Sequence, residues 1–205
     1  MLLASQVEIA VGYQIATQPL DDYKPVPEPL AYFQLSDFND YGQRVSQEAK
    51  VYLKQVPPAA LNRLLVPGQI LLAAKGARLL AACVRPEWLP AIGSPSFFVL
   101  SVHKPEELLP DFLTLVLNLP ETREALRARL TGTTIPTLNR RDLLEVELLA
   151  SPTAPPPRQW PSLKEQQQAV DLHNLWLQEK ALTTRYLQAR EQVIYNTITA
   201  NIKRH

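Results

Sequence analysis

"SLKEQQQAVDLHNLWLQEKALTTRYLQAREQVIYNTITANI", residues 162–202, is the stretch that decides the fold of this 205-residue chain. It contains neither proline nor glycine, although the chain has 19 prolines in all. Ser162 and Glu165 stand three residues apart, as in a capping box that begins a helix. A helix of about 40 residues would be about 60 Å long. Because a compact domain of this size cannot cover such a helix, we expect part of it to project or to pair.

Apolar residues recur along this helix at roughly heptad spacing, which favours pairing with a partner helix. Glu179 and Asn196 interrupt the heptad positions, and a polar residue there can fix register or orientation at a cost in stability. The alternative is a helix that lies on its own domain, and the length of the helix argues against it. The predicted dimerisation residues are Leu172, Leu175, Leu182, Tyr186, Ala189 and Val193.

The sequence before the helix, "SPTAPPPRQWP", has five prolines and predicts a stiff, extended linker. We therefore expect three parts: a globular domain over residues 1–151, a proline-rich linker over 152–161 and the long helix over 162–205. For the globular domain we expect an α+β fold with a mixed β-sheet and helices.

Four stretches of residues 1–102 read as strands. The expected strands are residues 5–15, with Val7, Ile9 and Val11 on one face, residues 31–38, a hairpin over residues 70–84, and residues 94–102. In the hairpin, Ile70–Ala73 and Leu79–Val84 form the arms around a Lys75–Gly76 turn, because glycine supplies the positive φ of tight turns. Residues 19–30 carry four prolines and three acids and predict a loop.

Residues 104–130 have apolar side chains at helical spacing in two segments, which Pro120 separates. The following "GTTIPTLNRRDLLEVEL", residues 132–148, predicts a turn and then a helix start. Asn139 can cap that helix, with Asp142 three residues on. Arg140 and Arg141 then occupy the first turn, where the helix dipole disfavours cations. An anionic partner on the exposed amides is one reason for this placement; solvation, or pairing with nearby acids, is the other.

The composition argues against several kinds of site. The formal net charge is +1, so a nucleic-acid-binding function must depend on local clustering of cations. The single cysteine, Cys83, has no general base beside it in the sequence, and His103, His173 and His205 match no zinc spacing. We expect a chain that performs no catalysis, binds no metal and holds no cofactor. The single cysteine, the absence of a basic secretory start and the absence of an apolar span predict a cytoplasmic location.

Four motifs, "PGQILLAAKG", "SFFVL", "GTTIPTLNRRDLLEVEL" and "SLKEQQQAV", follow one another in this order. In order and spacing they resemble the target-recognition domain and conserved helix of specificity (S) subunits of type I restriction–modification systems. The resemblance covers most of the chain, from about Val7 to the C-terminus. Members of that family usually carry two recognition domains and two helices, and this sequence resembles one half of that arrangement.

The resemblance implies a DNA-recognition function without catalysis. It implies a homodimer whose long helices form an antiparallel coiled coil and whose two domains read a bipartite, symmetric site on double-stranded DNA. Methyl transfer, with S-adenosylmethionine as cofactor, would belong to a partner adenine methyltransferase (M) subunit, and cleavage to a restriction/translocase (R) subunit. Such a system acts in phage defence.

Physical criteria select the residues that would contact DNA, because cations, hydroxyls and helix-start amides bind phosphates while arginine and amide side chains read bases. These candidates are Lys75, Arg78, Thr133, Thr134, Asn139, Arg140 and Arg141, with Gln34 and Ser36 on the second strand as weaker ones. The alternative for each of them is that it is an exposed surface residue with no role in DNA binding.

Three other functions fit parts of the same sequence. The first is a protein-interaction adaptor with a coiled-coil arm, which would bind no DNA. The second is a DNA reader of another defence complex, which only its bound partner distinguishes from an S subunit. The third is an enzyme with a site formed only in the fold, which needs a cluster of titratable groups in one pocket.

Overall fold

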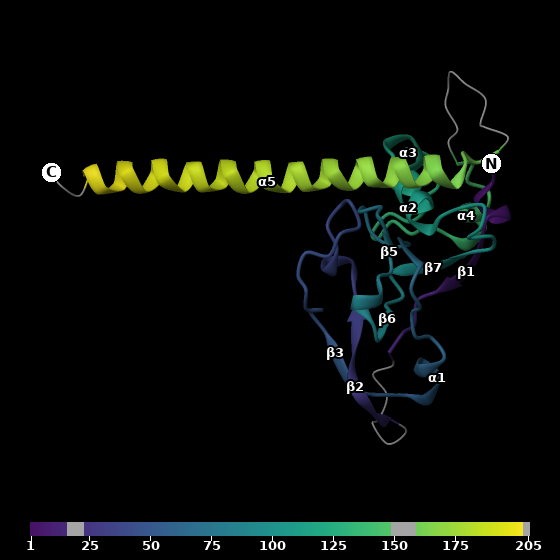
Figure 1. Ribbon diagram of the computed structural model, residues 1–205. Coiled ribbons are helices and arrows are strands. Elements are labelled where there is room, and N and C mark those ends of the chain that lie inside the picture. The colour runs from purple at the N-terminus through teal and green to yellow at the C-terminus, as the bar shows by residue number, and fades with distance from the viewer. Residues whose placement is uncertain (16–22, 149–158, 203–205) are drawn as a thin grey trace. The chain divides into compact units, whose positions relative to one another are not determined.

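The computed structural model describes residues 1–15, 23–148 and 159–202 of the chain (Figure 1). These residues form two compact units, Met1–Gln166 and Gln167–His205. The first unit combines two β-sheets with short helices, so the predicted α+β class with a mixed sheet is confirmed. The predicted linker, residues 152–161, lies outside the described residues except for its last three positions.

One sheet has four antiparallel strands in the order β1-β7-β4-β5. They are β1 (Val7–Val11), β7 (Phe97–Val102), β4 (Ile70–Ala73) and β5 (Ala81–Cys83). Every residue of β4 is buried, as its continuous apolar sequence predicts for a strand covered on both faces. In β1, Val7 and Ile9 are buried while Val11 is exposed, so the predicted face holds for its first two members.

The second sheet has the order β3-β2-β6. Its strands are β3 (Tyr52–Val56), β2 (Lys24–Phe33) and β6 (Ala91–Gly93), with β2 antiparallel to β3 and parallel to β6. The prediction of a loop over residues 19–30 was wrong from Lys24 onward, and its earlier residues 19–22 lie outside the described part. Strand β6 pairs with β2 only over Ala31–Phe33, and the β2–β3 register shifts between Pro25 and Leu30. Pro27 and Pro29 therefore lie in the irregular part of β2, which the pairing with β6 does not reach, and prolines are tolerated at such positions.

The second predicted strand, residues 31–38, ends earlier than expected. Strand β2 stops at Phe33, and Leu35–Asp37 form a 3-10 helix, η3. The buried Asp37 carboxylate accepts the backbone N–H of Gln34 (2.7 Å) and that of Lys50 (3.0 Å). Because this carboxylate satisfies amides that a strand would have to pair elsewhere, the chain turns at this point.

The predicted hairpin forms, but its turn is longer than two residues. Strands β4 and β5 pair from Ile70↔Cys83 to Leu72↔Ala81, and residues 74–80 connect them. Gly76 has a positive φ of 91°, as expected for a glycine in a turn. The Lys75–Gly76 segment nevertheless leaves the hairpin, because its backbone pairs with residues 136 and 137 instead.

The core lies between the two sheets and is rich in aromatic rings. Phe33 of β2, Phe38, and Phe97 of β7 are all fully buried. The Phe38 ring lies 5.5 Å from that of Phe33 and 5.8 Å from that of Phe97, both in edge-to-face geometry. Burying one such side chain contributes about 1.5–3 kcal/mol, and edge-to-face contacts add about 0.5–1.5 kcal/mol. These rings join residues from β2 and β7, and thus the two sheets.

The remaining short helices precede, separate or follow the strands along the chain. They are η1 (Leu3–Ser5), α1 (Pro58–Leu61), η4 (Pro86–Trp88), α2 (Pro110–Asn118), α3 (Pro120–Arg127) and α4 (Arg140–Leu144). Pro120 begins α3 and thereby separates it from α2, as predicted. Asn118 at the end of α2 accepts the N–H of Ala81 (3.0 Å) and donates to its carbonyl (2.8 Å), which attaches α2 to β5.

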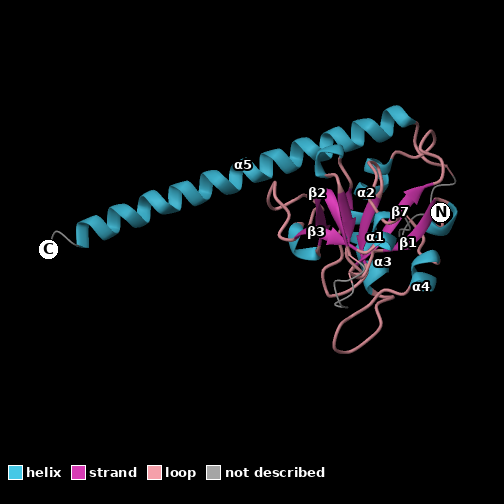
Figure 2. Cartoon of the chain, turned by 90° about the horizontal axis from the view of Figure 1, so that it is seen from below, coloured by secondary structure: helices cyan, strands magenta, loops and turns pink. Residues whose placement is uncertain are grey.

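Helix α5 (Leu163–Ile202) is continuous over 40 residues, as predicted (Figure 2). Its predicted capping box is confirmed. The Glu165 carboxylate accepts the N–H of Ser162 (2.8 Å) and its hydroxyl (2.7 Å), and the Ser162 hydroxyl accepts the N–H of Glu165 (3.4 Å). These bonds lower the pKa of Glu165 below its usual value.

Gln166, in the first turn of α5, is fully buried and bonds three backbone groups from two segments of the first unit. Its side-chain oxygen accepts the N–H of Leu109 (2.8 Å), and its amide group donates to the carbonyls of Glu107 and Pro161 (2.8 Å each). Glu107 and Leu109 precede α2, whereas Pro161 precedes α5. One side chain therefore fixes the start of α5 to the segment that begins α2.

We expect Gln166→Ala to lower the free energy of unfolding by about 2–4 kcal/mol, because three partly buried hydrogen bonds of a fully buried side chain are lost. Denaturant titration measures this change. Gln167→Ala is the matched control, since its side chain is exposed and bonds only Asp171 (2.8 Å), and it should change stability by less than about 0.5 kcal/mol. Equal effects of the two substitutions would contradict this role of Gln166.

Candidate nucleic-acid interface

A closed loop, Thr131–Thr137, presents the two predicted hydroxyl residues; we call it the threonine loop. The backbones of Thr131 and Thr137 exchange two hydrogen bonds (2.9 and 2.7 Å), which close the loop. Gly132 has a φ of 97°, and a Cβ there would lie 3.0 Å from the carbonyl oxygen of Ile135. Glycine is therefore required at this turn, and Thr133 and Thr134 follow it as exposed residues.

The threonine loop is hydrogen-bonded to the connection between β4 and β5. The N–H of Gly76 donates to the carbonyl of Pro136 (2.7 Å), and the N–H of Leu138 donates to that of Ala74 (2.8 Å). Lys75 forms a β-bridge with Thr137 between these two bonds. The structure thus pairs Lys75 with the loop that carries Thr133 and Thr134, two candidates that are far from Lys75 in the sequence.

Asn139 occupies the N-cap position of α4, as predicted, but its side chain makes no capping bond to the backbone. Its amide group donates instead to the Thr131 hydroxyl (3.2 Å) and to the Asp142 carboxylate (3.2 Å). The expected cap is therefore wrong in its chemistry. Asn139 acts as a link between the threonine loop and the first turn of α4.

Arg140 and Arg141 are the first two residues of α4, and both are exposed. Within the described residues, their guanidinium groups and the Lys75 ammonium group have no hydrogen-bond or ion-pair partner. Because α4 has only five residues, its dipole is weak and opposes these cations little. Three cations without a partner among the described residues thus lie on segments that pair with or follow the threonine loop.

Arg78 lies in the same connection between β4 and β5 but faces a different environment. Its guanidinium group donates to the Asp40 carboxylate (2.9 Å) and to the carbonyls of Phe38 (2.8 Å) and Leu35 (3.4 Å). Arg123 also donates to the Asp40 carbonyl and to Asn118 (2.8 Å). These bonds explain Arg78 as a residue that anchors the chain after η3.

The two weaker candidates, Gln34 and Ser36, flank or lie in η3 next to this arginine. Gln34 takes part in the capping box of η3, while Ser36 is exposed. The nine candidates therefore fall into two groups, and each group includes one cation from the connection 74–80. The members of one group lie in the threonine loop or in the segments that pair with it or follow it, and those of the other lie at η3 or bond to its neighbourhood. The first group, which we call the basic rim, contains Lys75, Thr133, Thr134, Asn139, Arg140 and Arg141; the second contains Arg78, Gln34 and Ser36.

Ile135, in the threonine loop, is not among the residues that the sequence predicted to contact DNA. Its side chain is 61% exposed, more than any other large apolar side chain in the described part of the first unit. The sequence could have drawn attention to Ile135, because it is an apolar residue between a Gly-Thr-Thr turn and a proline, and turn segments are normally polar.

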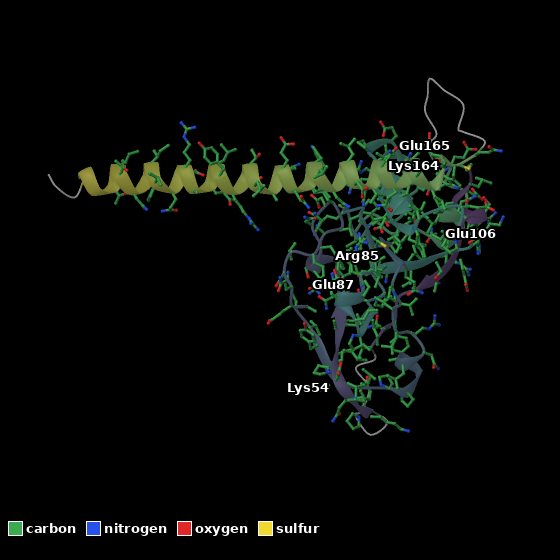
Figure 3. The ribbon with its side chains drawn as sticks, in the orientation of Figure 1. Lys54, Arg85, Glu87, Glu106, Lys164 and Glu165 are labelled. Atoms are coloured by element: carbon green, nitrogen blue, oxygen red, sulfur yellow. The ribbon has the colours of Figure 1, made fainter. Side chains whose placement is uncertain are left out.

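The cysteine of the chain, Cys83, is buried. Burial, and to a lesser extent the nearby Asp111 carboxylate, raises the pKa of the Cys83 thiol to about 12, which keeps it protonated near neutral pH. Asp111 itself pairs with Arg85, labelled in Figure 3 (2.6 Å). No group of three or more His, Cys, Asp or Glu residues that could hold a metal ion occurs in the described part of the chain.

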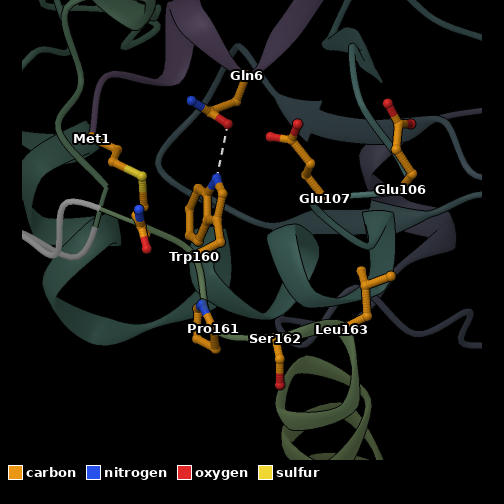
Figure 4. A pocket seen from close by; sticks show the side chains of 9 residues that line it. Met1, Gln6, Glu106, Glu107, Trp160, Pro161, Ser162 and Leu163 are labelled. Atoms are coloured by element: carbon orange, nitrogen blue, oxygen red, sulfur yellow. Dashed lines mark hydrogen bonds between the residues drawn. The ribbon is translucent and has the colours of Figure 1, made fainter.

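A cavity of about 480 Å³ lies beside the segment that leads into α5 (Figure 4). Its polar groups include Glu106, Glu107 and the Ser162 hydroxyl. The Trp160 indole N–H donates to Gln6 (2.8 Å), and Glu107 pairs with Lys104 (2.8 Å). Since Ser162 serves the capping box, the hydroxyl group in this cavity already has a structural role.

Helix α5 exposes the predicted seam. Leu172, Leu175, Leu182, Tyr186, Ala189 and Val193 are all exposed along it. Trp176, Leu187, Ile194 and Ile198 add further exposed apolar surface beside the seam, so apolar residues cover roughly half of the helix circumference. Among the described residues, no helix is both long and apolar enough to cross a membrane.

No protein-family model matches the chain, and no curated protein matches it. Solved structures do. The HsdS subunit from Thermoanaerobacter tengcongensis aligns with a TM-score of 0.54 at 19% identity, over 90% of this chain and 45% of that one. A chain from a structural study of complex assembly and conformational transition of the type I restriction–modification system aligns with a TM-score of 0.52 at 18% identity, over 90% of this chain and 39% of that one.

This chain therefore spans less than half the length of the S-subunit structure that it matches, while nearly all of its own length takes part. The identities are low, so the likeness concerns the fold. The chain has the fold of the specificity (HsdS) subunits of type I restriction–modification systems.

Proposed function

We propose that this chain is the sequence-specific DNA-recognition subunit of a type I restriction–modification complex. It acts as a homodimer, reads a bipartite symmetric site and directs a partner adenine methyltransferase, and a nuclease where one is present. S-adenosylmethionine then belongs to the methyltransferase. The observation that carries the proposal is the basic rim, in which three cations without a partner among the described residues and two exposed hydroxyl groups occur on an S-subunit fold.

The chemistry of the basic rim supports contact with a DNA backbone. Lys75, Arg140 and Arg141 supply charge, and the exposed hydroxyls of Thr133 and Thr134 supply neutral hydrogen bonds, as in phosphate contacts of DNA-binding proteins. The cations stay available because no described residue neutralises them. A net charge of +1 implies that the electrostatic attraction is local to this surface.

The apolar surface of α5 supports helix pairing. The six seam residues follow the heptad spacing of a coiled coil, and a second copy of the helix can bury them. The exposed apolar residues beside the seam exceed what a two-helix contact covers, which supports further contact with helices of the methyltransferase. Two-fold pairing of the helices also requires the two halves of the DNA site to be symmetric.

We expect Arg140→Ala combined with Arg141→Ala to weaken DNA binding and methylation by the reconstituted complex about tenfold or more, because two charged hydrogen-bond donors are lost. The slope of log affinity against log salt should fall by about two. The thermal unfolding midpoint should stay unchanged, since both side chains are exposed.

Lys104→Ala combined with Arg127→Ala is the matched control. It removes the same charge from two exposed ion pairs, Lys104–Glu107 and Arg127–Glu124, outside the basic rim. Both double variants have the same net charge. Equal losses in the two would assign the effect to overall charge, and unchanged methylation in the first would remove the arginines from the interface.

We expect Leu182→Glu combined with Val193→Glu to convert the dimer to a monomer, because like charges would then lie in the seam. Sedimentation equilibrium measures the change in mass. Thr184→Glu combined with Gln188→Glu adds the same charge on the opposite face of α5 and should leave the dimer intact. A dimer that survives the seam variant would rule out pairing through these residues.

Purification of the tagged chain from its host tests the proposed partners. Recovery of a stoichiometric adenine methyltransferase, followed by sequencing of methylated adenines, would support the proposal and reveal the two-part site. Recovery with other proteins and no methyltransferase, together with no salt-dependent DNA binding, would favour the adaptor function instead. Recovery of a complex that binds DNA but contains no methyltransferase would favour a DNA reader of another defence system.

A further inference from the structure

The backbone of Ile135 is held in place from several sides. Pro136 restricts Ile135 to extended conformations, and the Ile135 carbonyl accepts the Thr137 hydroxyl (3.1 Å). The two hydrogen bonds between Thr131 and Thr137 close the loop around it. Its side chain is therefore offered to the solvent by a fixed loop rather than by a loose one.

The surroundings of Ile135 indicate what it contacts. Thr133 and Thr134 precede it as exposed residues, and the threonine loop pairs directly with Lys75. The cores of protein–protein interfaces are depleted of lysine and other charged residues, whereas protein–DNA interfaces are rich in cations and hydroxyls. An apolar tip inside the basic rim thus matches a DNA groove better than a protein surface.

Base edges in the major groove offer one apolar feature, the C5-methyl group of thymine. An exposed isoleucine can contact it while the surrounding cations hold the neighbouring phosphates. We propose that Ile135 is a specificity-determining residue that contacts a C5-methyl pyrimidine in the recognised half-site. This inference rests on the proposed DNA-recognition function and adds a residue and a base feature to it.

The test uses the full chain in complex with its methyltransferase and duplexes that carry the recognised site. Each thymine of a half-site is replaced in turn by deoxyuridine, which removes the methyl group and keeps base pairing. We expect one position at which deoxyuridine lowers kcat/KM for methylation about fourfold or more in the wild type, as for the loss of one buried methyl contact.

Ile135→Ala should lower kcat/KM for methylation of the thymine duplex about fourfold. Deoxyuridine at that position should then cause no further loss. Ile135→Val keeps the branched side chain and should retain most of the discrimination. Val66→Ala is the matched control, because Val66 is 52% exposed at the opposite end of β4, and it should respond to deoxyuridine as the wild type does. Replacing cytosines by 5-methylcytosine tests whether the contact is to thymine or to a methylated cytosine.

Two results would overturn the inference while the proposed function stands. One is a wild type that methylates normally and is insensitive at every thymine and every cytosine position. The other is equal deoxyuridine sensitivity in the wild type and in Ile135→Ala. If Ile135→Ala lost activity only because it binds the methyltransferase less well, its sensitivity to deoxyuridine would still equal that of the wild type, and the inference would fail. A complex that neither binds nor methylates DNA would instead reject the proposed function, and this inference with it.

Discussion

Two backbone hydrogen bonds, from Gly76 to Pro136 and from Leu138 to Ala74, hold the candidate interface together. They join the connection between β4 and β5 to the threonine loop. In the sequence, that loop follows only after β5, β6, β7 and the helices η4, α2 and α3. Because backbone groups make these bonds, they do not engage the exposed side chains of Lys75, Thr133 and Thr134. The interface therefore depends on the placement of two loops by the sheet, and changes of side chain at the loop tips leave that placement intact.

The same bonds explain which parts of the fold could be predicted from the sequence. Strong apolar or helical periodicity predicted β1, β4, β7, the break at Pro120 and the whole of α5, because these patterns are local. The two-residue turn at Lys75–Gly76 was wrong because Pro136 and Thr137 compete for its backbone. Strand β2 was missed for a similar reason, since prolines exclude only a fully paired strand and β2 is paired irregularly.

For the candidate site, the sequence predicted residue types but not their partners. Arg78 and Arg140 read alike in the sequence, as exposed cations after turns. In the structure, Asp40, 38 residues away, pairs with Arg78, while Arg140 has no partner among the described residues. Asn139 likewise occupies the predicted position and bonds side chains where a backbone cap was expected. Long-range pairing determines which cations remain available, and no local pattern records it.

The modest charge of the chain constrains how the proposed complex would bind DNA. Three cations per domain would neutralise few phosphates, so two domains joined through α5 in the proposed dimer would gain more from acting together than either would gain alone. A fixed helical spacer of about 60 Å suits such joint binding, because it sets the separation of the half-sites without the entropy cost of a flexible linker. In the proposed complex, the methyltransferase would supply further phosphate contacts, and sequence discrimination would depend on the few groups at the loop tips.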